Sequence, residues 1–200
     1  MMNELIAKIE QWAEDRNIIK GSKPIDQAMK LFSEFGELAD NVGKGRDCRD
    51  DIGDVFVVLI IIAAQLDHTI AEINLGKINY PYGDKYAVSE LCSQLYEVVC
   101  HAKNGFIDHN AVTSSLEFLQ CIANNNGHTL EECVQIAYND IKDRRGVLMN
   151  GVFIKESDPA YASVVAAIES NYDIEEDKEL NAIADGRKGQ ERISVNIEDL

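Results

Sequence analysis

Apolar residues recur every three to four positions along most of this chain, the spacing that gathers them on one face of a helix. In residues 3–16, for example, Leu5, Ile9 and Trp12 share one face. The same spacing predicts further helices over residues 25–42, 50–66, 69–75, 87–103, 111–124, 129–145 and 160–170. Residues 76–85, rich in glycine, asparagine and proline, are predicted to form a loop. The fold class is therefore predicted to be all-α, as an antiparallel helical bundle.

The most apolar segment, residues 55–64, is too short to span a bilayer, so it is predicted to be a buried core helix. The N-terminus lacks a basic head followed by a long apolar run, and no signal peptide is expected. The five cysteines form no Cys-x-x-Cys pair, which suits a reducing compartment. We therefore expect a cytoplasmic protein without a membrane partner.

The chain also contains an internal similarity. Sliding it by 60 residues aligns residues 26–72 with residues 86–132 without a gap, and ten aligned pairs are identical. The turn glycines Gly45 and Gly105 are one such pair, and the stretch HTIAE recurs as HTLEE. We interpret this similarity as an internal duplication of a helix pair.

The duplication sets the predicted domain organisation. An active repeat covers about residues 26–75 and a degenerate repeat about residues 86–135, both within one domain over residues 1–170. Residues 171–200 are predicted to be an acidic, flexible tail, because they are polar and residues 173–200 hold nine acids against four bases.

Charge narrows the possible partners. The net charge is -16, from nineteen basic and thirty-five acidic residues. Such a chain repels a phosphate backbone, so nucleic acid is not an expected partner. A nucleoside triphosphate is also an anion, and its binding would require divalent cations that invert the local field.

Two pairs of acids lie on either side of a short glycine-rich loop. Glu34 and Glu37 are near the end of one predicted helix, and Asp51 and Asp54 are near the start of the next. Because a short loop makes the two helices antiparallel, the four carboxylates are predicted to converge. Oxygen ligands without cysteine or histidine favour Mg²⁺, with Mn²⁺ as a substitute. The alternative is a solvated acidic face, but Asp54 opens the most apolar helix, which favours the metal site.

The second repeat lacks most of this acidic set. Gln94, Ala111 and Ser114 stand where the first repeat has Glu34, Asp51 and Asp54, and only Glu97 keeps a carboxylate; this indicates one working half and one supporting half. A di-iron site is not expected, because no histidine follows an acid at the Glu-x-x-His spacing.

Basic residues near the acids are candidates for binding phosphate. Lys30 precedes Glu34 by one helical turn, and Lys44 lies in the connecting loop. An ordinary ion pair between Lys30 and Glu34 is an equally good interpretation. Trp12, the only tryptophan, is expected in the core rather than as a platform for base stacking.

A second polar and basic group closes the predicted helix over residues 129–145. It comprises Asn139, Lys142, Arg144 and Arg145. On a continuous helix, Asn139, Lys142 and Arg145 share one stripe and Arg144 lies opposite. Cations that complement a helix C-terminus explain part of this group equally well.

The stretch from QWAEDRNI through QAMKLFSEFGELADNVGKGRDCRDDIGDVFVVLIIIA resembles the MazG-like all-α nucleotide pyrophosphohydrolases. Their signature is Glu-x-x-Glu, a spacer and Glu-x-x-Asp. It is matched by Glu34, Glu37, Asp51 and Asp54, with aspartate in place of the third glutamate. The ending AYNDIKDRRGVLMNGVFIKESD resembles the terminal helix and tail of short, often phage-encoded members. The resemblance covers about residues 5–158.

This resemblance implies a magnesium-dependent enzyme that hydrolyses an NTP or dNTP to the monophosphate and pyrophosphate. We expect Glu34 and Glu37 to be catalytic, with Glu34 accepting the proton of the attacking water, and all four acids to bind the metal. The resemblance assigns Asn139, Lys142 and Arg144 or Arg145 to substrate phosphates. A duplicated chain also resembles the dimeric dUTPase branch, so we expect a homodimer, in the host cytoplasm for a phage-encoded chain.

Two alternatives stay open. The substrate could be an alarmone or a modified nucleotide, handled by the same metal cluster. The protein could instead be a non-catalytic nucleotide-sensing or partner-binding helical protein, because Asp51 departs from the signature and one repeat is degenerate.

Overall fold

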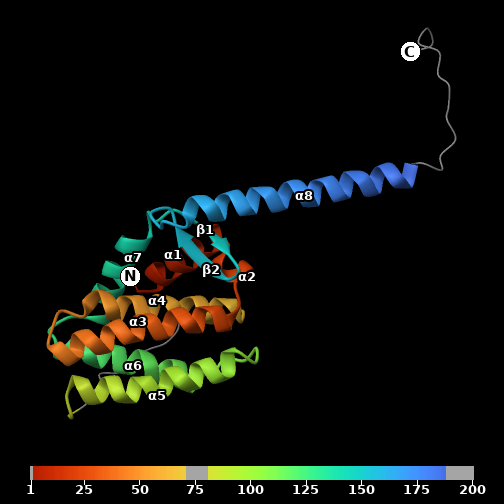
Figure 1. Cartoon of the computed structure of the whole chain (residues 1–200). Helices are drawn as coiled ribbons and strands as arrows, with labels where there is room; N and C mark the ends of the chain where they lie inside the picture. The colour runs from red at the N-terminus through yellow and green to blue at the C-terminus, as the bar shows by residue number, and fades with distance from the viewer. Residues whose placement is uncertain (1, 71–80, 188–200) are drawn as a thin grey trace, which may run out of the picture. The chain divides into compact units, whose positions relative to one another are not determined.

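The computed structural model describes residues 2–70 and 81–187 of the 200-residue chain. They form two units, Met1–Glu156 (unit 1) and Ser157–Leu200 (unit 2). Unit 1 contains α1 (Met2–Asp15), α2 (Ile18–Gly21), α3 (Pro24–Lys44), α4 (Arg49–Gln65), α5 (Asp84–Ala102), α6 (His109–Asn125), α7 (Leu130–Ile141), β1 (Gly146–Met149) and β2 (Val152–Lys155) (Figure 1). Unit 2 contains α8 (Tyr161–Arg187). The predicted all-α class is confirmed, with one small antiparallel hairpin as the addition.

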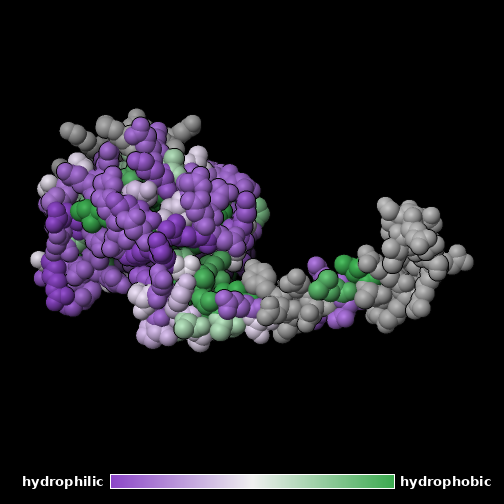
Figure 2. All heavy atoms as spheres, turned by 90° about the horizontal axis from the view of Figure 1, so that it is seen from above, coloured by the Kyte–Doolittle hydropathy of each residue, from purple (hydrophilic) through white to green (hydrophobic). Residues whose placement is uncertain are grey.

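Helix α4 is the centre of unit 1. It packs against α1, α2, α3, α6 and α7, and the run Val55–Ala63 is buried along its whole length. The predicted core helix is therefore confirmed. Gly53 permits the close approach of α7, because a Cβ at this position would lie 2.3 Å from the carbonyl oxygen of Cys133. By contrast, the face of unit 1 that Figure 2 shows is mostly hydrophilic, as the strongly acidic composition requires.

The two helical hairpins of unit 1 share their dimensions. Helices α4 and α6 both have 17 residues, and they begin at residues 49 and 109, 60 positions apart; α3 and α5 begin at residues 24 and 84, again 60 apart. The chain leaves the first helix of each pair through a glycine with positive φ, 64° at Gly45 and 81° at Gly105. The helix starts of the two pairs are thus separated by the same offset of 60 residues that aligns the sequence with itself.

The segment after α7 differs from the prediction. Helix α7 ends at Ile141 instead of near Arg145, and Gly146 begins β1 instead of capping the helix. Strands β1 and β2 are joined by Asn150 and Gly151, whose φ angles are 51° and 79°. A two-residue turn with both φ angles positive matches the right-handed twist of a hairpin, and Asn-Gly is its strongest sequence signal.

Unit 2 also differs from the prediction. Helix α8 extends from Tyr161 to Arg187, whereas the sequence pattern predicted a helix ending at residue 170 and a flexible tail from residue 171. The predicted end of the helix at residue 170 was wrong, because residues 171–187 continue it with three glutamates and two alanines, which favour helix. Most of the predicted helix over residues 69–75 and half of the predicted loop over residues 76–85 lie outside the described residues.

Candidate functional site

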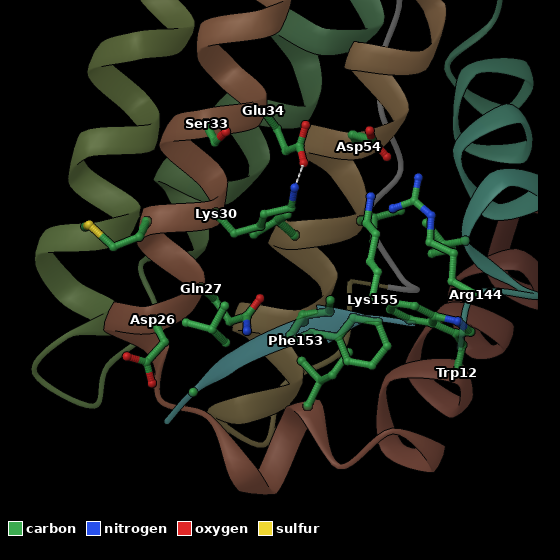
Figure 3. Close-up of a pocket in the computed structure, with 18 residues that line it drawn as sticks. Trp12, Asp26, Gln27, Lys30, Ser33, Glu34, Asp54, Arg144, Phe153 and Lys155 are labelled. Atoms are coloured by element: carbon green, nitrogen blue, oxygen red, sulfur yellow. Dashed lines mark ion pairs between the residues drawn. The ribbon is translucent and has the colours of Figure 1, made fainter. Parts of the chain in front are cut away.

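A pocket of about 360 Å³ opens in unit 1 between α3, α4, the end of α7 and the β-hairpin (Figure 3). Trp12 from α1 and Ile18 from α2 complete its wall. It is lined by three kinds of groups: the acids Asp26, Glu34 and Asp54, the cations Lys30, Arg144 and Lys155, and a mostly apolar wall that includes Trp12, Ile18, Val57, Val58, Ile61, Ile141 and Phe153. A cavity of this size with a few charged groups on an apolar wall suits a small ligand.

Glu34 enters the pocket from the buried side of α3. Leu31 and Leu38 flank it one turn away on each side, and burying them carries Glu34 inward. Its side chain is only 6% exposed, and its Oε1 forms an ion pair with Nζ of Lys30, four residues earlier (Figure 3). The predicted ion pair between these residues is therefore present, and Lys30 also lines the pocket, as its candidacy for phosphate binding requires.

Asp54 enters from the second turn of α4, beside the fully buried Val55. Burial raises the pKa of Asp54 from 3.8 to about 7, and the negative charges of Glu34 and Asp50 add to this effect. The positive charges of Arg144 and Lys30 act in the opposite direction. Glu34 and Asp54 are therefore close enough to repel each other across the pocket.

The other two predicted acids occupy different positions. Asp51 is buried on α4, where its Oδ2 accepts a hydrogen bond from Nδ2 of Asn41 at 2.8 Å, and burial raises the pKa of this carboxyl. Asp51 does not line the pocket, although its pKa also responds to the charge of Glu34. Glu37 is exposed and does not line the pocket.

Of the four predicted acids, Glu34 and Asp54 therefore line the pocket, whereas Asp51 is buried outside it and Glu37 is exposed to solvent. Within residues 2–70 and 81–187, no three acidic, histidine or cysteine side chains lie together as ligands of one metal ion. The predicted convergence of all four carboxylates is therefore not present in these side-chain positions. The donor chemistry still suits a hard divalent cation, because Glu34 and Asp54 place oxygen atoms and repelling charge in one partly desolvated pocket.

The basic candidates also divide into residues that line the pocket and residues that lie outside it. Arg144 lines the pocket and forms an ion pair with Asp140, while its carbonyl oxygen accepts hydrogen bonds from Nε and Nη2 of Arg16 at 2.9 and 2.8 Å. Arg145 is exposed and outside the pocket. The predicted stripe of Asn139, Lys142 and Arg145 assumed a helix continuing to residue 145, and this assumption was wrong because α7 ends at Ile141.

The remaining candidates lie outside the pocket. Lys44 is exposed and paired with Asp40 at 2.6 Å. The exposed Asn139 accepts a hydrogen bond from Nζ of Lys142 at 3.3 Å, and neither residue lines the pocket.

Four residues that line the pocket come from the unpredicted hairpin: Gly151, Val152, Phe153 and Lys155. Lys155 and Phe153 lie on β2, and the side-chain nitrogens of Lys155 and Arg144 point toward Asp54 in Figure 3. The Asn-Gly dipeptide between two apolar runs was the sequence signal for this hairpin.

An aromatic pair closes one end of the pocket. Phe153 packs edge-on against Trp12, with ring centroids 6.3 Å apart, and the guanidinium of Arg16 lies 4.9 Å from the Trp12 ring centre. Trp12 is only partly buried, so it is a wall of the pocket rather than a fully enclosed core residue. The buried Gln27 also lines the pocket, and its Nε2 donates to Oγ of Ser22 at 3.0 Å.

Comparison with known proteins gives one relative. The chain is 50% identical over 66 residues to an uncharacterized 18.2 kDa protein from the rep-hol intergenic region of Haemophilus phage HP1. The match covers 32% of this chain and 40% of the phage protein. No protein-family model and no solved structure matches the chain. In the part of the chain that the structure describes, no helix has the length and apolar character needed to cross a bilayer.

Proposed function

We propose that this protein is a magnesium-dependent nucleoside triphosphate pyrophosphohydrolase, which converts an NTP or dNTP and water to the nucleoside monophosphate and pyrophosphate. The observation that carries the proposal is the composition of the pocket. It places Glu34 and Asp54 opposite the cations Arg144 and Lys155, beside an aromatic wall. A nucleotide has the matching parts, since its phosphates require cations and its base is a flat aromatic ring that can stack on an aromatic wall.

Glu34 and Asp54 are the carboxylates that would hold the magnesium ion. Asp51, behind them on α4, and the exposed Glu37 stay predicted ligands from the signature. A bound magnesium ion would neutralise phosphate charge and lower the pKa of a water molecule. The high net negative charge of the chain makes such a cation necessary for binding a triphosphate.

The chain's own residues have separate roles in this reaction. Lys30, Arg144 and Lys155 line the pocket and would bind phosphate oxygens, including charge that develops on the departing pyrophosphate. The Asp54 carboxylate lines the pocket on the side that faces Arg144 and Lys155, and it would accept the proton of the attacking water. The sequence pattern gives this role to Glu34, and Asp54 is the second candidate for it, because both carboxylates line the pocket.

The similarity to MazG-like enzymes and the internal duplication belong to the same proposal. The support is the shared offset of 60 residues between α3 and α5 and between α4 and α6, together with the loss of three of the four signature acids from the second hairpin. The second hairpin would then support the first, since α5 packs against both α3 and α6. The predicted homodimer stays a prediction.

The test is incubation of the protein with each common NTP and dNTP and Mg²⁺, followed by measurement of monophosphate and pyrophosphate. We expect both products in equal amounts from at least one nucleotide, and their loss with EDTA and in Asp54→Ala. An exposed acid on α5, Glu90, provides the control substitution Glu90→Ala, which should keep full activity. Nucleotide binding without pyrophosphate release, at any Mg²⁺ or Mn²⁺ concentration, would instead support a nucleotide-sensing protein. Pyrophosphate release only from an alarmone or a modified nucleotide would assign that nucleotide as the substrate and would leave the proposed site residues unchanged.

A further inference from the structure

The pocket contains a cation of its own beside the acid that would hold magnesium. Nζ of Lys30 forms an ion pair with Oε1 of Glu34 inside the pocket. The two side chains differ in freedom, because the Lys30 side chain is 52% exposed and that of Glu34 is 6% exposed. The ammonium can therefore move out toward solvent, while the carboxylate is held in place.

We infer that Lys30 is an internal counter-cation that keeps divalent metal out of the pocket until a nucleotide enters. This inference rests on the proposed function and adds the order of binding. In the free protein, the ammonium neutralises Glu34 and leaves a weak site for a second cation. When nucleotide phosphates arrive, Lys30 turns to them, and Glu34 becomes available to the metal that accompanies the nucleotide.

Electrostatics supports this order. A unit positive charge in contact with a carboxylate repels a second cation from the same oxygen atoms and weakens its binding by a factor of about ten or more. The effect is strong here because Glu34 is buried, where water screens charges poorly. Lys30 also lowers the pKa of Asp54, so its charge reaches both pocket acids.

A second lysine on the same helix provides a matched control. Lys44 pairs with Asp40 across one helical turn, as Lys30 pairs with Glu34, but both Lys44 and Asp40 are exposed and outside the pocket. Neutralising Lys44 changes the net charge by the same amount as neutralising Lys30. Any general effect of charge on metal binding will therefore appear in both variants.

The experiment measures binding of Mn²⁺ alone to the full chain, by electron paramagnetic resonance of the free ion. We expect Lys30→Met to bind Mn²⁺ at least about ten times more tightly than the unmodified protein. Lys30→Arg, which keeps the positive charge, and Lys44→Met should match the unmodified protein. Circular dichroism and thermal unfolding of each variant confirm that the fold is intact, and Lys30→Arg provides the comparison if the methionine variant is less stable.

Equal or weaker Mn²⁺ binding by Lys30→Met would overturn the inference, as would equal tightening in Lys44→Met. The assay of pyrophosphate release separates this failure from failure of the proposed function. If the protein releases pyrophosphate but Lys30→Met does not tighten Mn²⁺ binding, the proposed enzyme activity stands and the proposed role of Lys30 as a counter-cation is wrong. Absence of Mn²⁺ binding by both proteins, together with absence of pyrophosphate release, would overturn both.

Discussion

Replacing Asp54 with asparagine is expected to stabilise the folded protein above neutral pH while it abolishes activity. The folded-state pKa of Asp54 is about 7, against 3.8 for an unperturbed aspartate. The folded protein therefore binds a proton at this site more tightly than the unfolded chain does. It follows that the protonated carboxyl stabilises the fold below pH 3.8, and that this contribution is lost as the pH rises toward 7.

The magnitude follows from the difference between the two pKa values. A difference of about three corresponds to about 4 kcal/mol of unfolding free energy, lost in full above pH 7. The loss of unfolding free energy is only about 1 kcal/mol at pH 4.5, and most of the loss occurs at higher pH. Asparagine cannot ionise, so Asp54→Asn should gain up to about 4 kcal/mol at pH 8, and less where the buried amide lacks a hydrogen-bond partner.

The assay is urea unfolding of both proteins at pH 4.5 and pH 8, in EDTA so that no divalent metal stabilises the carboxylate. The gain should be at least twice as large at pH 8 as at pH 4.5. Asp47→Asn is a control of opposite sign, because the side chain and backbone of Arg49 lower the pKa of Asp47 to about 2. That variant should lose under about 1 kcal/mol at pH 8, as expected of a surface pair. A gain that is independent of pH, or a loss at pH 8, would refute the reasoning.

Three further predictions concern packing, the phosphate site and the aromatic wall. Gly53→Ala should destabilise the protein by about 2–4 kcal/mol in urea unfolding, because the added methyl group would clash with the backbone of α7. The control Gly36→Ala, on an open face of α3, should stabilise the protein by about 0.5–1 kcal/mol. Arg144→Ala should reduce kcat/KM for pyrophosphate release at least about tenfold, while Arg145→Ala keeps it within about twofold; equal losses would contradict the placement of Arg144. Trp12 is the only tryptophan, so nucleotide binding should change the protein's fluorescence, and an unchanged spectrum at saturation would place the base elsewhere.

The helices of unit 1 were predictable because their signal is local. Periodic apolar positions and a turn glycine defined α3, α4, α5 and α6 to within a few residues. The hairpin after α7 was missed even though Asn150-Gly151 is a strong local signal, because the basic residues before it were assumed to continue the helix. The extent of α8 was missed for a different reason, since its low apolar periodicity conceals good helix formers.

The site was predictable only where it depends on the helix pair. Glu34 and Asp54 were identified because spacing and a short loop place them on facing helices. Glu37 was expected beside Glu34. Three residues on a helix turn through about 300°, so the two side chains point about 60° apart, and Glu37 lies on the exposed side of α3. Lys155 and Phe153 were not predictable from spacing, because only the tertiary fold brings β2 over the acids.

The energetics of Asp54 also indicate that this carboxylate serves something other than the fold. Within the described residues its side chain has no hydrogen bond or ion pair, and its burial disfavours the charged form. The aligned position in the second hairpin is the neutral Ser114, on a helix of the same length and register. The helical hairpin therefore forms without a carboxylate here. A charge that the fold does not require, placed in a pocket beside Glu34 and three cations, is better explained by a ligand that interacts with it.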